Sequence, residues 1–171
     1  TVLREKIGQR ENIQPEHIIC GNGAADLIFR TVFAAKPKKA LLLAPTFSEY
    51  EKALSAAGCE INFYALKEEN DFALGDDYIN VLEGGYDIVF LCSPNNPTGG
   101  ELSEQCLLEI VTRCKRLGIL PVIDMSFADF SENTVSANVL AEAGAAVIKA
   151  FTKIYAMPAL RLGYMLCCDE D

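Results

Sequence analysis

The chain has 171 residues, half of them apolar, which is enough for one domain with a substantial hydrophobic core. Its formal net charge is −9 and it contains no basic cluster, so neither nucleic acid nor an anionic membrane is expected as a partner. No apolar run approaches the length of a membrane span, and the first residues do not resemble a secretory signal.

The cysteines and the histidine argue against a metal site. The seven cysteines are an odd number, and neither a Cys-x-x-Cys nor a Cys/His ligand spacing occurs. Several lie within apolar stretches, where a thiol acts as a small hydrophobic group. We therefore expect reduced cysteines, a cytoplasmic location and no metal. The single histidine, His17, lies in a polar connection and is expected at the surface, which argues against histidine-based catalysis.

Short apolar stretches alternate with helix-like segments along the chain. The predicted strands are Ala40–Ala44, Cys59–Tyr64, Ile88–Cys92, Leu120–Ile123, Ala145–Ala150 and Leu162–Cys167. The predicted helices are Val2–Arg10, Ala24–Ala35, Ser48–Ala57, Asp76–Leu82 and Ser103–Leu117. Most of the strands are continuous apolar runs, which is typical of strands buried on both faces. The alternation predicts a three-layer α/β/α fold with a doubly wound, mostly parallel sheet.

The connection after Ala150 departs from this pattern. Only about ten residues separate Ala150 from Leu162, and Pro158 interrupts them, whereas a parallel crossover needs a dozen or more. We therefore expect the last strand to be antiparallel and Lys153 to lie in the reversal, just past the carboxyl end of its strand. Ligands of open α/β sheets bind at this edge.

Neither end of the chain is typical of a domain boundary. The chain begins inside the first predicted helix and ends directly after a predicted strand, on Asp169-Glu-Asp. We therefore expect a fragment of a longer polypeptide. The acidic stretch Lys67–Asp77 is expected to be a surface loop.

The first motif, Gly21-Asn-Gly-Ala-Ala-Asp26, precedes a predicted helix. Small residues there let backbone N–H groups approach an anion, and the helix dipole favours negative charge. A phosphate could rest on Gly23, Ala24 and Ala25. The alternative is a tight turn without a ligand. The Gly-x-Gly-x-x-Gly spacing of dinucleotide sites is absent.

Two further motifs follow predicted strands. Phe47, in Pro45-Thr-Phe-Ser-Glu-Tyr50, could stack on a flat heteroaromatic ring, or simply pack in the core. The segment Ser93-Pro-Asn-Asn-Pro-Thr-Gly99 is too polar and too rich in proline to continue a strand, so it predicts a sharp turn. The amide of Asn96, held by the following proline, could bond a ligand oxygen; a purely structural turn is the alternative.

Asp124 ends a strand predicted to be buried, where a carboxylate is costly unless it is paired. A protonated pyridine nitrogen would pair it and keep the ring cationic. A metal or a helix N-terminus are the alternatives. Asp129 is expected to be a solvated loop residue.

Lys153 lies between apolar neighbours beyond a predicted buried strand. Schiff-base chemistry needs an amine that can lose its proton near neutral pH, which burial or a nearby cation favours. Arg161 could supply that cation and clamp a phosphate, and Thr152 could offer its hydroxyl to the same group. The alternative is an ordinary surface lysine.

Taken together, the motifs resemble the fold-type-I pyridoxal-phosphate (PLP) enzymes of the class I/II aminotransferase superfamily over essentially the whole chain. The matching motifs are Gly21-Asn-Gly-Ala-Ala, Ala44-Pro-Thr-Phe-Ser-Glu-Tyr, Pro94-Asn-Asn-Pro-Thr-Gly, the Asp124 motif, and Thr152-Lys153 with Arg161-Leu-Gly. Within the superfamily the chain is most similar to histidinol-phosphate aminotransferases and threonine-phosphate decarboxylases.

The resemblance implies a role for each candidate residue. Lys153 would form a Schiff base with PLP, Asp124 would pair with the pyridinium nitrogen, and Asn96 would bond the phenolic oxygen. Phe47 would stack on the ring and Ser126 would lie beneath it. The residues implied to hold the phosphate are Gly23, Ala24, Ala25, Thr152 and Arg161.

The resemblance also implies what the chain is part of. Residues 1–171 would be the PLP-binding large domain, without the N-terminal arm and without the small C-terminal domain that carries the substrate-binding arginine. The implied function is aminotransfer to or from an amino acid or amino-alcohol phosphate, in a homodimer, and the isolated fragment is expected to be inactive. The alternatives are a threonine-phosphate decarboxylase, a non-catalytic assembly domain of the same fold, and a nucleotide-binding domain.

Some positions depart from the superfamily pattern. The usual Asp-Glu-Ala-Phe/Tyr reads Asp124-Met-Ser-Phe127, so a phenylalanine stands where a tyrosine often donates to the phenolic oxygen. Ala150 replaces a serine that usually donates to the phosphate, and Ala159 replaces a glycine. Because Lys153 and Asp124 are both present, PLP binding is still expected.

Overall fold

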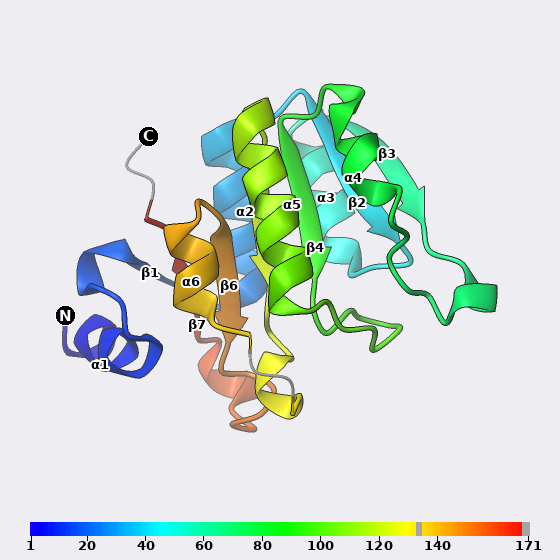
Figure 1. Ribbon diagram of the computed structural model, residues 1–171. Helices are drawn as coiled ribbons and strands as arrows, with labels where there is room; N and C mark the ends of the chain where they lie inside the picture. The colour runs from blue at the N-terminus through cyan, green and yellow to red at the C-terminus, as the bar shows by residue number, and fades with distance from the viewer. Residues whose placement is uncertain (133–134, 169–171) are drawn as a thin grey trace.

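The computed structural model describes residues 1–132 and 135–168, and Figure 1 shows how their helices and strands are arranged. These residues contain one sheet of seven strands in the spatial order β1-β7-β6-β5-β4-β2-β3. The strands are β1 (Ile18–Gly21), β2 (Lys39–Ala44), β3 (Glu60–Ala65), β4 (Ile88–Cys92), β5 (Leu120–Asp124), β6 (Ala146–Ala150) and β7 (Gly163–Leu166). The helices are α1 (Val2–Glu11), α2 (Ala24–Ala35), α3 (Ser48–Ala56), α4 (Tyr78–Val81), α5 (Glu104–Leu117) and α6 (Ala137–Glu142).

The predicted fold class is confirmed. Strands β3, β2, β4, β5 and β6 pair in parallel, and β7 pairs antiparallel with both β6 and β1. The antiparallel return of β7 follows from its short connection to β6, which holds one 3-10 turn and no crossover helix. Helices α2 and α3 pack on one face of the sheet and α5 and α6 on the other, which makes three layers (Figure 1).

The two faces of the sheet explain why its strands read as continuous apolar runs. Leu41 and Leu42 of β2 are both buried, with 1% and 0% of their surface exposed, yet they belong to the hydrophobic clusters on opposite faces. Successive side chains of a strand point to opposite sides, so both must be apolar when helices cover both. Each such side chain stabilises the fold by roughly 1.5–3 kcal/mol.

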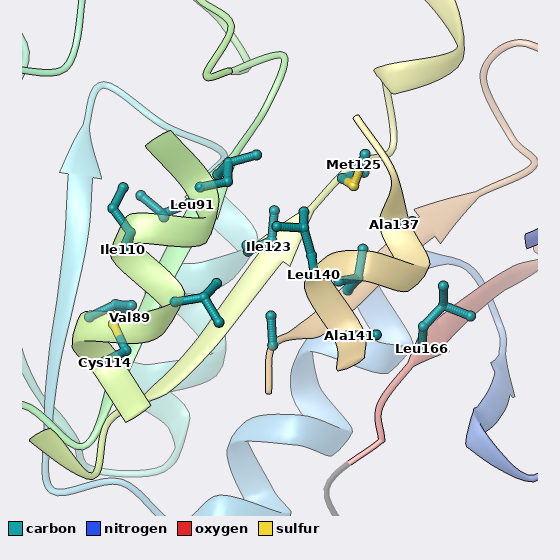
Figure 2. Packing of buried hydrophobic residues seen from close by; sticks show 14 of the residues in the cluster. Val89, Leu91, Ile110, Cys114, Ile123, Met125, Ala137, Leu140, Ala141 and Leu166 are labelled. Carbon is teal, nitrogen blue, oxygen red and sulfur yellow. The ribbon is translucent and has the colours of Figure 1, made fainter. Parts of the chain in front are cut away.

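Helix α5 shows how local sequence sets the bounds of a helix. The hydroxyl of Ser103 accepts a hydrogen bond from the backbone N–H of Cys106 at 3.2 Å, and Gly118 ends the helix with a left-handed φ of 69°. The stripe predicted to face the sheet is buried. Figure 2 shows part of it against β4, with Ile110 and Cys114 over Val89 and Leu91.

Some elements differ from the predictions. Strand β1 and helix α6 are not predicted, because runs of four and six residues are too short to show a periodic pattern. Strand β3 begins one residue later than predicted and lies at the edge of the sheet, where Phe63 is 51% exposed. The helix predicted from Asp76 forms only at Tyr78–Val81, followed by a 3-10 turn. His17 is half-buried.

The stretch predicted as a surface loop, 67–77, is mostly exposed and contains a single 3-10 turn. Over the described residues, no helix has both the length and the apolar character that crossing a membrane requires.

Candidate functional site

A cavity of about 120 Å³ lies at the carboxyl ends of β4, β5 and β6. Nine of the ten residues predicted to form the site line it: Ala24, Ala25, Phe47, Asn96, Asp124, Ser126, Thr152, Lys153 and Arg161. The tenth, Gly23, lies beside Arg161. A larger cavity of about 610 Å³ near α1 is lined by none of these ten residues. The structure thus brings the whole predicted set together.

The sheet positions these side chains. Asp124 is the last residue of β5, Asn96 follows β4, and Lys153 follows β6. Because parallel strands end at the same edge, residues far apart in the sequence meet there. Gly23, at the start of α2, lies at the same carboxyl end of the sheet, on the other side of β7 and next to Arg161.

Asp124 is a buried carboxylate with two defined hydrogen bonds. Only 2% of its surface is exposed. Its Oδ1 accepts from the backbone N–H of Ser126 at 2.9 Å, and its Oδ2 accepts from the Tyr50 hydroxyl at 2.8 Å. Burial raises the pKa of Asp124, while the hydrogen bonds from Ser126 and Tyr50 and the charge of Lys153 oppose this rise. The effect of burial is the larger one, and among the residues that the structure describes no cation forms an ion pair with Asp124.

The sequence patterns do not single out Tyr50 as a functional residue. Its ring is fully buried, stacked on Phe90 with centroids 4.9 Å apart and in edge contact with Phe47 at 5.6 Å. Burial, and then the nearby Asp124 charge, raise the pKa of Tyr50 well above its usual range, so the hydroxyl remains a donor to Asp124. One sequence signal could have identified Tyr50. It is a tyrosine on the core-facing side of a predicted helix, and a buried phenol hydroxyl needs a hydrogen-bond partner.

Lys153 lines the cavity and is also exposed to solvent. Its Nζ is 5.2 Å from the centroid of the Phe127 ring, a cation–π contact. Its charge also acts on Asp124. Phe127 therefore lies at the site, where the sequence pattern noted it only as a replacement for tyrosine.

Asn95 and Asn96 have different surroundings. Asn95 is buried; its Nδ2 donates to the Pro45 carbonyl at 3.1 Å and to the Thr98 hydroxyl at 2.9 Å, and its Oδ1 accepts from Thr46 at 3.1 Å. The side chain of Asn96 lines the cavity and makes no hydrogen bond with any residue that the structure describes. Asn95 thus holds the turn together and leaves the amide of Asn96 available.

The guanidinium of Arg161 lies against the first turn of α2. A Cβ atom on Gly23, whose φ is 87°, would come within 2.9 Å of the Arg161 Nη2. On Gly163, a Cβ would meet the Gly23 carbonyl carbon at 2.9 Å and the Ala24 nitrogen at 3.0 Å. Only glycine allows so close an approach at these two places. Free N–H groups of the helix and a guanidinium therefore face the same space, which favours an anion.

Two more groups complete the cavity. The thiol of Cys92 donates to the Pro94 carbonyl at 3.2 Å, and burial, followed by the Asp124 charge, raises its pKa to about 12, so it is neutral. The buried hydroxyl oxygen of Ser126 makes no hydrogen bond of ordinary geometry with a described residue, although it is near enough to Asp124 to lower the pKa of that carboxyl.

The prediction that Asp129 is a solvated loop residue is wrong. Its carboxylate accepts from Lys149 Nζ at 3.1 Å and pairs with Arg10 Nη2 at 3.0 Å. Lys149 is buried in β6, on the face opposite to α2, and a buried ammonium needs such a partner. The contact between Arg10 and Asp129 could not be predicted from the sequence, because the two residues are 119 positions apart.

Comparisons with known proteins agree with the geometry. Residues 2–171 match the family model of aminotransferase class I and II. The chain is 36% identical to the threonine-phosphate decarboxylase of Salmonella typhimurium, covering 98% of this chain and 47% of that protein. It is 31% identical to the histidinol-phosphate aminotransferase of Pseudoalteromonas atlantica, covering 90% of this chain and 42% of that protein. The chain thus spans about half the length of the curated relatives it matches.

Among solved structures, a decarboxylase from Sulfurospirillum multivorans superposes with a TM-score of 0.88 at 29% identity, covering 98% of this chain and 49% of that one. Members of these families use pyridoxal 5′-phosphate, the cofactor that the sequence predicts. From the match over residues 2–171, the chain belongs to the class I and II aminotransferase family.

Proposed function

We propose that the protein is a PLP-dependent aminotransferase that acts on an amino acid or an amino-alcohol phosphate, with Lys153 as the residue that binds the cofactor. One observation carries the proposal: an amine, a fully buried carboxylate and an anion-favouring helix start line a single cavity. An enzyme that holds an aldehyde-bearing pyridine phosphate needs these three groups together.

The residues present fit that cofactor. The buried carboxylate of Asp124 would gain in a pyridinium nitrogen the cationic partner that burial demands. The unpaired hydroxyl of Ser126 would gain a neighbour in the cavity. The close approach of Arg161 to Gly23 leaves backbone N–H groups and a guanidinium for the phosphate.

Each residue then has a distinct task. Asp124, held by Tyr50 and the Ser126 N–H, would keep a proton on the ring nitrogen. Arg161 and the N–H groups at the start of α2 would bind the phosphate, and Thr152 would add its hydroxyl. The remaining predicted tasks are a donor to the phenolic oxygen from Asn96 and a stacking surface from Phe47.

Lys153 is proposed to move the proton at the substrate Cα. When bound, PLP supplies an electron sink for the charge that develops there. The amine lies beside the cavity over the Phe127 ring, which leaves it mobile enough to reach a bound substrate. General acid–base transfer by such a group contributes roughly 10²–10⁴ to a rate.

The test replaces Lys153 by alanine in the complete natural protein. The Lys153→Ala variant should lose at least about a hundredfold in turnover, the minimum expected when a general acid–base group is removed. The exposed Lys67→Ala variant serves as the control and should keep full turnover. Borohydride reduction of the PLP-loaded parent should leave the cofactor attached to Lys153, as located by mass spectrometry. Full turnover in Lys153→Ala, or a label elsewhere, would end the proposal.

Decarboxylation is a second candidate. The threonine-phosphate decarboxylase of Salmonella typhimurium is more similar to the chain than the aminotransferase of Pseudoalteromonas atlantica, at 36% against 31% identity. Threonine phosphate or serine phosphate, incubated with the loaded protein, should release CO₂ if this branch holds. Transfer of the amino group to a 2-oxo acid, without CO₂, supports the aminotransferase branch instead. A protein that forms no adduct with PLP would be the non-catalytic assembly domain.

We further propose that residues 1–171 form the cofactor-binding large domain of a homodimer. The match to about half the length of the relatives supports the domain assignment. Light scattering on the complete natural protein tests the dimer, and a monomer that retains full activity would contradict it.

A further inference from the structure

The segment that carries Lys153 is weakly packed beyond its first residue, Phe151, which contacts the core and the Tyr164 ring. We call residues Phe151–Met157 the lysine turn. Lys153, Ile154, Tyr155 and Ala156 are all exposed. One backbone hydrogen bond, from Phe151 N to the Leu162 carbonyl at 3.1 Å, holds the start of the turn to the chain entering β7. Segments with so few buried contacts open at a low free-energy cost unless something else holds them.

A cluster of four charged side chains lies next to the turn. This four-charge cluster consists of Arg10, Glu11, Asp129 and Lys149. Lys149 Nζ donates to Asp129 Oδ1 at 3.1 Å and to Glu11 Oε1 at 3.3 Å. Arg10 pairs with Glu11 at 3.5 Å and with Asp129 at 3.0 Å. The cluster therefore has two positive and two negative charges, each near a partner of opposite sign.

The inner half of the cluster is buried and rigidly held. The side chains of Glu11 and Lys149 are 8% and 11% exposed. The hydroxyl of Tyr164 donates to Glu11 Oε1 at 2.6 Å, and Tyr164 lies opposite Lys149 in the β6–β7 pairing. Charged groups with this much burial persist only with defined partners, so the cluster fixes the end of α1 on the sheet.

Arg10 is the outer member of the cluster and reaches the lysine turn. Its Nη2 donates to Asp129 Oδ2, and its Nη1 donates to the hydroxyl of Tyr155. The guanidinium carbon also lies 5.3 Å from the centroid of the Tyr155 ring. A planar guanidinium can make these contacts together, whereas a lysine ammonium cannot span them in one geometry.

Both partners of Arg10 lie close to the site in sequence. Asp129 follows Phe127 by two residues, and Tyr155 follows Lys153 by two. Phe127 and Lys153 are the two members of the cation–π contact, 5.2 Å apart. Figure 1 shows the two segments near each other at the lower end of the sheet, in yellow and in orange-red. Arg10 therefore ties together the two segments whose side chains meet at the cavity.

We propose that Arg10 is a positioning residue for Lys153. It holds the lysine turn against the segment of Phe127, and α1 acts as the support through which the four-charge cluster sets the place of the amine. This inference rests on the proposed role of Lys153 as the cofactor-binding residue. Its effect on the turn can nevertheless be measured without cofactor. Reactions of a bound amine depend on placement to within about 0.5 Å, so a loosened turn should slow the reaction with PLP.

The test compares three variants by hydrogen exchange in the cofactor-free complete protein. Arg10→Met removes the contacts with Asp129 and Tyr155, and Arg10→Lys keeps the positive charge but cannot reach both partners at once. Lys6→Met is the control, because it removes an exposed cation of α1 whose side chain bonds only Gln9 among the described contacts. Arg10→Met should speed exchange of the two hydrogen-bonded amides of the turn, Phe151 N–H and Ala156 N–H, by about threefold to tenfold, the loss expected for a charge-assisted bond at a partly exposed site. Lys6→Met should match the parent.

Arg10→Lys decides between charge and geometry. It should loosen the turn as Arg10→Met does, and a turn as protected as in the parent would overturn the proposal. Unchanged exchange of the Phe151 and Ala156 amides in Arg10→Met would also overturn it. So would faster exchange spread evenly over the sheet, because that indicates a general loss of stability.

The second readout is the rate at which the visible absorbance of bound PLP appears after mixing. Arg10→Met should form the band more slowly than the parent and reach the same final height, while Lys6→Met should form it at the parent rate. Equal rates in all variants would contradict positioning of Lys153. Failure of the proposed function looks different, because borohydride then leaves no label on Lys153 in the parent.

Discussion

At the scale of single residues, Asp124 shows how a fold can hold a carboxylate ready for a cation. Hydrogen bonds to a charged group contribute about 1.5–3 kcal/mol each, while burying an ion costs several kcal/mol. Two such bonds, from Tyr50 and Ser126, leave the desolvation of Asp124 only partly offset, and its pKa is raised. Part of the desolvation energy of Asp124 is therefore not offset by its hydrogen bonds, and a positively charged pyridinium ring beside the carboxylate would reduce it.

This cost predicts a specific pH dependence of stability. A carboxyl with a raised pKa binds its proton more tightly in the folded state than in the unfolded state. Stability of the cofactor-free protein should therefore fall as the pH rises from about 3.9, the usual pKa of aspartate, through the raised folded-state pKa. Asp124→Asn, which cannot titrate, should remove this part of the pH dependence.

Urea unfolding of the cofactor-free parent and of Asp124→Asn, at matched pH values, gives the measurement. The difference in unfolding free energy between the two should change across that window and become constant above it. A difference that does not vary with pH would show that Asp124 has the same pKa in the folded and unfolded states.

At the scale of elements, the site depends on how closely β7 approaches the start of α2. Gly163, the first residue of β7, pairs with both Gly21 of β1 and Ala150 of β6. The backbone of Gly23 lies where a side chain on Gly163 would stand. This contact places Arg161, two residues before Gly163, beside the helix start that is proposed to bind the phosphate.

Gly163→Ala should therefore destabilise the protein and weaken PLP binding together. Its Cβ would meet backbone atoms at 2.9, 3.0 and 3.1 Å, and backbone cannot move aside as a flexible side chain can. Overpacking of this kind costs about 1–3 kcal/mol. The unfolding free energy from a denaturant titration measures the cost, and the fluorescence of bound PLP measures the affinity.

Gly100→Ala is the matched control, because the nearest atom to its added Cβ is a side-chain oxygen at 3.4 Å. It should change stability by less than about 1 kcal/mol and leave PLP affinity unchanged. A Gly163→Ala variant as stable as this control would mean that β7 and α2 can separate without cost.

At the scale of the whole molecule, the sheet is buried at its centre and open at its edges. All residues of β4 and β6 are buried, whereas at the two edges β3 has only exposed or half-buried residues and β1 has a single buried residue, Ile18. The site lies at the end of the central strands, so the most buried part of the sheet carries Asn96, Asp124 and the strand before Lys153.

Native-state hydrogen exchange should therefore rank the strands. Amides of β4 and β5 should exchange only through global unfolding, and those of β3 through local opening at lower free energy. Exchange followed by NMR or mass spectrometry in increasing denaturant gives the ranking. Protection of β3 equal to that of β4 would indicate that the edge is covered in the complete protein.

Much of this architecture can be predicted, because short stretches of the sequence indicate the individual strands, helices and turns. The continuous apolar run of β4 and the capped, striped segment of α5 predict their own bounds and burial. The short link from Ala150 to Leu162 predicts the antiparallel return of β7. The candidate residues at the strand ends meet because parallel strands end together, so the membership of the cavity is also predictable.

The contacts that escaped prediction join residues that no local pattern relates. Tyr50 reaches Asp124 across 74 positions, and Arg10 reaches Asp129 across 119. In the sequence, Asp129 cannot be distinguished from an ordinary loop carboxylate. The structure shows that Lys149 of β6 donates a hydrogen bond to it. Strand β1 is too short to show an alternating pattern, and it forms because it pairs antiparallel with β7.

The amino-acid sequence by itself determined the order of most strands and helices, the resemblance to the family, and nine of the residues that line the cavity, since periodicity and turn chemistry act over a few residues. Only the tertiary structure decided that Tyr50 holds Asp124 and that Arg10 bridges Asp129 and Tyr155. The physical reason is that side-chain pairing is set by the packing of whole elements, which brings distant charges and hydroxyls within hydrogen-bond reach.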